Sequence, residues 1–193
     1  MAEPTPRLPE TIVLVGAPGA GKSTIGARLA RRLGMDFTDV DELIEQRAGK
    51  PIPEIFLMDG EPAFRELERE TTLELVGRPG IVSLGGGAVM NPLIRQALAE
   101  RTVVWLDVSA HHASRRVGLT GNSRPLLAGG NVHSTMVRLM NERLPLYREV
   151  STHRIDTNGL KPAAVVRELL ARLGVDDPEQ PEPVQDDDQT GEQ

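Results

Sequence analysis

Apolar residues in this chain form short continuous runs that alternate with longer stretches in which they recur every three or four positions. The continuous runs lie at residues 12–15, 80–84 and 102–108, and such runs are typical of strands that are buried on both faces. Two more short strands are predicted at residues 35–40 and 153–156. Strands that alternate with helices predict an α/β fold with a parallel, doubly wound sheet of five strands and flanking helices.

Helices are predicted between the strands, because caps, prolines and glycines mark where each one starts and stops. The first begins inside a glycine-rich loop and ends at Gly34, and another begins after Ser109. We expect Pro145 to kink or end the long helix that contains it. The remaining predicted helices cover residues 42–48, 52–58, 61–76, 93–99, 133–149 and 163–173.

Composition separates a folded body from the two ends of the chain. Residues 1–10 are proline-rich without an apolar core, so a flexible N-terminal arm is expected rather than a signal peptide. Residues 176–193 hold eight acidic residues and no Lys or Arg, which predicts a disordered acidic tail. A solubilising role for this tail is favoured over a docking role. The body at residues 11–175 has the size of one domain.

The acidic tail also dominates the charge of the chain. The formal net charge is −6, from 28 acidic residues against 22 Lys and Arg, and leaving out the tail gives a body of about +2. Arginines in the later part of the chain suit phosphate and carboxylate ligands. A basic stripe interleaved with aromatic residues is missing from the sequence, so nucleic acid is not an expected partner.

Cysteine and long apolar runs are both absent from the sequence. Without cysteine the chain has neither disulfides nor a thiolate metal site, which suits a reducing cytoplasm. No apolar run approaches the roughly 20 residues that span a bilayer, so no membrane partner is expected. We expect a monomeric cytoplasmic protein.

The clearest chemical pattern is GAPGAGKS at residues 16–23, which matches the phosphate-binding loop G-x-x-x-x-G-K-[ST]. Its glycines let successive N–H groups converge on an anion, and the following helix adds its unpaired donors. Lys22 is expected to reach the β- and γ-phosphates of a nucleotide, and Ser23 to bind Mg²⁺. A turn that binds nothing is disfavoured by the flanking strand and helix. The predicted ATP-binding residues here are Gly19, Ala20, Gly21, Lys22, Ser23 and Thr24.

Further candidates lie at the ends of two predicted strands, where doubly wound sheets bind their ligands. Asp39 and Asp41 follow the second strand, where one could serve a metal and the other a second substrate. Alternatively, Asp41 only caps the next helix. Gly85, Gly86 and Gly87 follow the third strand and indicate either a close approach of the backbone to a ligand or a plain flexible turn.

The class of phosphate-loop protein is narrowed by the segments between the strands. Residues 118–131 hold four glycines and Arg124, which is typical of a mobile lid. Residues 41–76 form a helical insertion after the second strand, whose Arg65 and glutamates we place mostly on the solvated side. The guanine-selecting string N-K-x-D is absent from the sequence, which disfavours a GTPase. Small size, lid and insertion favour a small-molecule kinase of nucleoside-monophosphate-kinase shape.

Six motifs in one order resemble the shikimate kinase family. They are GAPGAGKST, DVD at 39–41, DGEPAFRELE at 59–68, SLGGGA at 83–88, SRPLL at 123–127 and ERLPLY at 142–147. Together they cover roughly residues 11–173. Gluconate kinase shares the scaffold without combining these motifs. The acidic tail lies outside the family pattern, and the turn at residues 158–162 lacks the arginine that the family often has there.

The resemblance implies ATP-dependent phosphorylation of the 3-hydroxyl of shikimate, a step toward aromatic amino acids. It implies that Asp41 contacts the ring hydroxyls as the candidate base. Arg65 and Arg143 would hold the carboxylate, aided by the backbone of residues 85–87. Paired guanidinium groups suit this task because they bind a carboxylate through two parallel hydrogen bonds.

The same resemblance implies roles around the nucleotide. Arg124 would close over the phosphates and act with Lys22 and Asp41 in catalysis, while Arg116 would lie near the adenine. Ser23 would bind Mg²⁺ with Asp39 in support. Two alternatives stay open: a kinase for another hydroxy acid such as gluconate, and a regulatory module that binds ATP without transferring phosphate.

Overall fold

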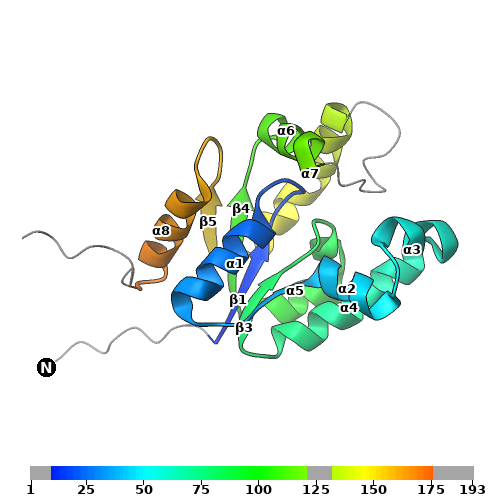
Figure 1. The fold of residues 1–193 in the computed structure, drawn as a ribbon, viewed down its shortest axis with the longest axis horizontal. Helices are drawn as coiled ribbons and strands as arrows, with labels where there is room; N and C mark the ends of the chain where they lie inside the picture. The colour runs from blue at the N-terminus through cyan, green and yellow to red at the C-terminus, as the bar shows by residue number, and fades with distance from the viewer. Residues whose placement is uncertain (1–9, 121–131, 176–193) are drawn as a thin grey trace, which may run out of the picture.

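A five-stranded parallel sheet forms the centre of the computed structural model, which describes residues 10–120 and 132–175 (Figure 1). The strand order is β2-β3-β1-β4-β5, and every neighbouring pair is parallel. The fold class that the sequence predicts is confirmed. The strands are β1 (Thr11–Val15), β2 (Phe37–Asp39), β3 (Gly80–Ser83), β4 (Thr102–Asp107) and β5 (His153–Asp156).

Helices connect the strands and cover both faces of the sheet (Figure 1). Among the described helices, none is both long and apolar enough to cross a membrane. The helices are α1 (Lys22–Leu33), α2 (Val40–Ala48), α3 (Ile52–Met58), α4 (Gly60–Val76), α5 (Pro92–Leu98), α6 (Ala110–Thr120), α7 (Val132–Val150) and α8 (Pro162–Arg172), with a short 3₁₀ helix η1 (Ala88–Met90).

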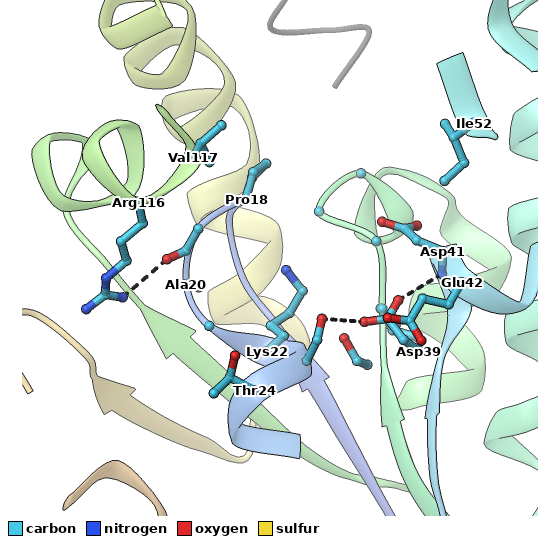
Figure 2. Close-up of a pocket in the computed structure, with 18 of the residues that line it drawn as sticks. Pro18, Ala20, Lys22, Thr24, Asp39, Asp41, Glu42, Ile52, Arg116 and Val117 are labelled. Atoms are coloured by element: carbon cyan, nitrogen blue, oxygen red, sulfur yellow. Dashed lines mark hydrogen bonds between the residues drawn. The ribbon is translucent and has the colours of Figure 1, made fainter. Parts of the chain in front are cut away.

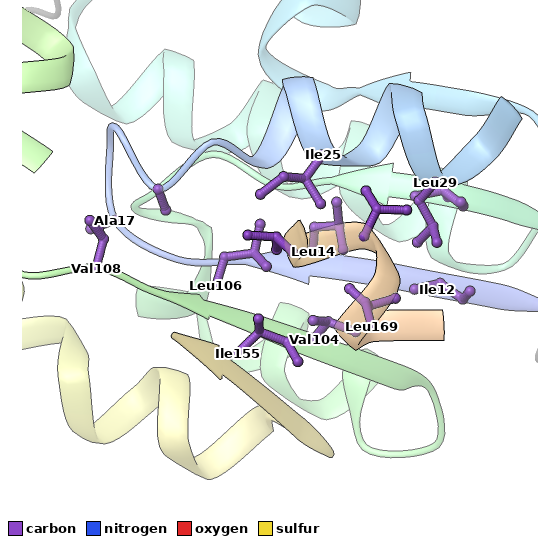
Figure 3. Packing of buried hydrophobic residues seen from close by; sticks show 14 of the residues in the cluster. Ile12, Leu14, Ala17, Ile25, Leu29, Val104, Leu106, Val108, Ile155 and Leu169 are labelled. Carbon is purple, nitrogen blue, oxygen red and sulfur yellow. The ribbon is translucent and has the colours of Figure 1, made fainter. Parts of the chain in front are cut away.

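Strand β1 is buried along its whole length because its successive side chains enter different cores. Ile12 and Leu14 of β1 pack with α1 and α8 on one face (Figure 3). Val13 and Val15 pack with α4, α5 and α7 on the other. Each such side chain stabilises the fold by about 1.5–3 kcal/mol when fully buried. Trp105 of β4 is buried in the second core as well.

The boundary between β2 and α2 differs from the prediction. The strand ends at Asp39 and the helix begins at Val40, so the predicted strand is too long and the predicted helix starts too late. The reason is the N-cap: the Asp39 side chain accepts a hydrogen bond from the backbone N–H of Asp41 at 3.0 Å. The capping residue is therefore Asp39, and the interpretation of Asp41 as the cap was wrong.

Two later elements run further than the sequence indicates. Helix α7 continues past Pro145 to Val150, because Tyr147 and Val150 beyond the proline are buried in the core. Proline therefore does not end this helix. Helix α6 continues to Thr120, so the first three residues of the predicted lid are helical. The remaining lid residues, the acidic tail and most of the N-terminal arm lie outside the described residues.

Candidate active site

A cavity of about 960 Å³ opens at the carboxyl ends of the strands, where the segments after β1, β2, β3 and β5 meet (Figure 2). Parallel strands end at one edge of the sheet, so segments distant in the sequence are brought together there. Arg124 lies outside the described residues. All other predicted site residues line this cavity: Gly19, Ala20, Gly21, Lys22, Ser23, Thr24, Asp39, Asp41, Arg65, Gly85, Gly86, Gly87, Arg116 and Arg143.

The loop of residues 16–23, here called the phosphate loop, joins β1 to α1 in a conformation that requires glycine. Gly19 and Gly21 have φ angles of 81° and 93°, in the left-handed region that residues with a β-carbon avoid. A β-carbon on Gly19 would also lie only 2.7 Å from the Ala113 carbonyl oxygen on α6. Gly21 is the N-cap of α1 and has no side chain to cap it, so backbone donors there are suited to an anion.

Lys22 begins α1 and is buried, with 7% of its surface exposed. Its ammonium group donates hydrogen bonds to the carbonyl oxygens of Gly16 at 2.9 Å and Ala17 at 3.3 Å. The positive charge is therefore held against the start of the phosphate loop, within the cavity (Figure 2).

Ser23 and Asp39 connect the phosphate loop to the end of β2. The Ser23 hydroxyl donates to Asp39 Oδ2 at 2.6 Å, while Asp39 Oδ1 accepts from the Asp41 backbone (Figure 2). The Asp39 carboxylate thus links the first turn of α1 to the first turn of α2 through hydrogen bonds. Glu42 lies next to this pair, and its pKa is raised by burial and by Asp39, Glu45 and Asp41. A hydroxyl and a carboxylate are the oxygen ligands that Mg²⁺ prefers.

The other end of the cavity is formed by charged side chains around residues 85–87, here called the glycine turn. The backbone of the glycine turn lies so close to these side chains that a β-carbon on Gly85 would be 2.6 Å from Glu68 Oε1 and 2.7 Å from Asp41 Oδ1. One on Gly87 would lie 2.6 Å from Arg65 Nη1. Gly85 and Gly87 therefore allow the backbone to contact charged groups that any side chain would displace.

Glu68 is a residue of this site that the sequence analysis missed, because it placed the glutamates of α4 on the solvated side. Only 2% of Glu68 is exposed, and it accepts a hydrogen bond from Arg65 Nη1 at 2.6 Å. Burial raises the pKa of the Glu68 carboxyl, and Asp41 adds to this, while Arg65 and Arg143 oppose it. Its position four residues after Phe64 places both on the buried face of the helix, and this spacing was the available signal.

Arg143 reaches the same region from α7. It is 6% exposed, and its Nε atom is buried with no hydrogen-bond partner among the described residues. Its charge lowers the pKa of Glu68, as that of Arg65 does. Two guanidinium groups from different helices therefore face one buried carboxylate. We call the region formed by Asp41, Arg65, Glu68, Arg143 and the glycine turn the acceptor pocket.

Arg116 lies at the opposite end of the cavity, on α6 (Figure 2). Its guanidinium donates to the Gly19 carbonyl at 3.2 Å and to the Thr157 carbonyl at 2.7 Å. It thereby joins the phosphate loop to the segment after β5. That segment adds Leu160 and Pro162 to the lining, which gives this end of the cavity an apolar wall beside backbone groups.

The arrangement has a phosphate loop in the middle, an apolar wall on one side and a pocket with paired arginines on the other. This is the site of a P-loop kinase that acts on a small anionic acceptor. The family model "Shikimate kinase" matches residues 18–174, and the chain belongs to the shikimate kinase family.

Individual relatives agree with this assignment. The shikimate kinase of Mycobacterium ulcerans is 53% identical over 167 residues, which cover 86% of this chain and 89% of the relative. The shikimate kinase of Mycobacterium tuberculosis strain H37Ra is 52% identical over 168 residues, covering 86% and 94%. The resemblance that the sequence motifs indicate is confirmed.

Solved structures show the same fold. Shikimate kinase from Acinetobacter baumannii in complex with shikimate matches with a TM-score of 0.82 and 38% identity, over 87% of this chain and 94% of that one. A gluconokinase from Sinorhizobium meliloti matches with a TM-score of 0.55 and 22% identity, over 86% and 93%. The second match shows a shared fold alone.

Proposed function

We propose that this enzyme transfers the γ-phosphoryl group of ATP to the 3-hydroxyl of shikimate and forms shikimate 3-phosphate. The observation that carries the proposal is the convergence of Arg65, Arg143 and Asp41 on one pocket that shares a cavity with Lys22. This supports an acceptor with one carboxylate and nearby hydroxyls. The family and the Acinetobacter baumannii complex with shikimate support the choice of acceptor.

The acceptor pocket would position shikimate by charge and hydrogen bonds. Arg65 and Arg143 bind the carboxylate, and the backbone of the glycine turn contributes donors beside them. Asp41 accepts a hydrogen bond from the reacting hydroxyl and takes its proton as the phosphoryl group arrives. Because phosphoryl transfer needs alignment more than covalent help, a rigid pocket supplies much of the catalysis.

The phosphate loop would hold the phosphates of ATP, with the amides of residues 19–24 as donors and Lys22 at the β- and γ-phosphates. Arg124, from the lid, would add positive charge during transfer, and closure would keep water from the γ-phosphate. Arg116, Leu160 and Pro162 would enclose the adenine, because they line the end of the cavity beyond the loop.

Ser23 and Asp39 fit a Mg²⁺ ion, since their oxygens lie 2.6 Å apart beside the phosphate loop. When bound with ATP, this ion neutralises charge on the phosphates. We assign Ser23 as its ligand and Asp39 as the group that supports it through water.

We also propose how the chain is divided and where it works. Residues 41–76 act as the acceptor-binding insertion and 118–131 as the lid, between the arm at 1–10 and the tail at 176–193. The protein works as a monomer, and it works in the cytoplasm, where the ATP that it consumes is found. Sedimentation and cell fractionation test these two points.

A coupled ADP assay with ATP, Mg²⁺ and a panel of hydroxy acids tests the function. We expect turnover with shikimate and little with gluconate. Arg143→Ala should raise the KM for shikimate roughly 10- to 100-fold, the value of hydrogen bonds between charged groups, and leave the KM for ATP nearly unchanged. Arg148→Ala, an exposed arginine on the same helix, is the matched control. Robust turnover of gluconate without turnover of shikimate would refute the proposal.

A further inference from the structure

Tyr147 makes a buried hydrogen bond to the glycine turn. Its hydroxyl donates to the Gly86 carbonyl oxygen at 2.6 Å, and 2% of the residue is exposed. The bond joins α7 to a segment 61 positions earlier in the chain. A carbonyl buried in this way loses its partner if the hydroxyl is removed, and water does not readily replace it.

The turn that Tyr147 holds is part of the acceptor pocket and lies close to the phosphate loop. A β-carbon on Gly86 would lie 3.0 Å from Pro18 Cδ in the phosphate loop. On either side of it, Gly85 approaches Asp41 and Glu68, and Gly87 approaches Arg65. A shift of the turn by a few tenths of an ångström would therefore change the position of acceptor-pocket backbone relative to its charged side chains.

Tyr147 and Arg143 occupy the same face of α7, because they are four residues apart. Arg143 lines the cavity, whereas Tyr147 is not among the lining residues. The tyrosine ring stacks on Trp105 of β4, with centroids 6.2 Å apart and an interplanar angle of 25°. The ring is thus fixed against the sheet, and one helix face supplies both a guanidinium to the pocket and a hydroxyl to the turn.

We propose that Tyr147 is a positioning residue for the acceptor: its hydrogen bond to Gly86 sets the glycine turn in register with Arg143 and Arg65. It acts through the turn and does not touch shikimate. The inference rests on the proposed function, since it names a further residue of that same site.

Calorimetric titration of the full chain with shikimate, and separately with ADP, tests the inference. Tyr147→Phe keeps the ring and removes only the hydroxyl. We expect the Kd for shikimate to rise about tenfold, as for loss of one buried hydrogen bond, and the Kd for ADP to change less than about twofold. The matched control is Thr11→Val, which removes a hydroxyl that donates to the Arg78 carbonyl at 2.8 Å. Thr11 is the first residue of β1 and so lies at the end of this strand opposite the cavity.

The control separates positioning from stability. Both variants lose one hydroxyl–carbonyl bond, so both should unfold at a lower temperature, but Thr11→Val should bind shikimate as the parent does. An unchanged Kd for shikimate in Tyr147→Phe, or an equal loss for both ligands, overturns the inference. A parent chain that does not bind shikimate refutes the proposed function itself, and the inference with it.

A second measurement avoids mutation, in case Tyr147→Phe does not fold. The sequence contains one tyrosine, so growth on 3-fluorotyrosine places a single fluorine probe at Tyr147 with the hydroxyl retained. We expect its ¹⁹F resonance to shift on addition of shikimate and to move much less with ADP alone. A resonance that ignores shikimate in a protein that binds it contradicts the inference.

Discussion

Glu68 interacts with charged groups from three helices: Arg65 on its own helix α4, Arg143 on α7 and Asp41 on α2. The hydrogen bond from Arg65 to Glu68 fixes one guanidinium, which also donates to the more exposed Glu61 through Nε at 3.2 Å and Nη2 at 3.0 Å. We expect this buried carboxylate to order the two arginines before shikimate binds. Arginine side chains that are already ordered lose less conformational entropy when the ligand binds.

The contribution of Glu68 to binding can be measured with Glu68→Gln, which keeps the shape and removes the charge. We expect the KM for shikimate to rise roughly tenfold, because Arg65 loses a hydrogen bond between charged groups, with little change in the KM for ATP. Glu66→Gln, which breaks the exposed pair with Arg69 on the same helix, should change neither value. Equal effects of the two variants would contradict the role given to Glu68.

The stability of the fold should also depend on pH through Glu68. Its pKa is raised mainly by burial, so the folded state keeps the proton to higher pH than the unfolded state. Its contribution to stability is therefore complete below the ordinary value of 4.5 and is lost as the pH rises through the raised pKa. Urea unfolding from pH 4 to 8 should show the parent losing free energy of unfolding relative to Glu68→Gln as the pH rises. A constant or opposite difference would contradict this.

Gly85 has the least space of the three glycines for a side chain, because a β-carbon there would have two carboxylate oxygens within 2.7 Å. Gly85→Ala should therefore reduce kcat/KM for shikimate at least about a hundredfold, since misplacement of about 1 Å has this effect. Gly77→Ala is the control, because its φ is −84° and its nearest neighbour is 3.7 Å away. Near-parental activity of Gly85→Ala, measured in the coupled assay, would show that the turn can move freely.

Helix α2 illustrates how one element serves both fold and site. Its N-cap Asp39 also accepts the Ser23 hydroxyl, so the start of the helix is fixed relative to the phosphate loop. The sequence predicted a helix here but placed its start two residues late. Local propensity could not decide the boundary, because Asp39 and Asp41 are equally suitable caps. The contact with Ser23 decides it, and that contact exists only in the folded chain.

Two substitutions of Asp39 separate capping from metal binding. Asparagine caps helices as well as aspartate does, so Asp39→Asn should unfold at nearly the parental temperature, while Asp39→Ala should lose about 0.5–2 kcal/mol. Both remove the charge beside Ser23, and both should need about tenfold more Mg²⁺ for half-maximal rate. Thermal unfolding and a Mg²⁺ titration measure the two effects. Parental Mg²⁺ dependence in Asp39→Asn would exclude the supporting role.

Across the whole molecule, the parallel topology determines which residues meet. Short apolar runs predicted β1, β3 and β4, because strands buried on both faces leave a strong pattern. The alternation of strands with helices then predicted a parallel sheet. Some candidate residues were found where glycine or acids follow strands, whereas the roles of Arg65, Arg116 and Arg143 came from the family resemblance. Glu68 and Tyr147 were not found, since a glutamate on a helix and a tyrosine in an apolar stretch look ordinary until the helices are packed. Apart from Arg65, which lies on the same helix as Glu68, their partners lie on other elements or at the glycine turn.

The central claim is that one cavity joins the phosphate loop to an acceptor pocket and transfers phosphate between their ligands. Phosphorus NMR of a reaction with ATP, Mg²⁺ and shikimate tests it most directly, with Lys22→Ala as the comparison. We predict one new phosphate ester at the 3-hydroxyl of shikimate, formed by the parent and slower by at least about a hundredfold in a folded Lys22→Ala protein. An ester at another hydroxyl, release of inorganic phosphate alone, or equal rates in the two proteins would contradict the account.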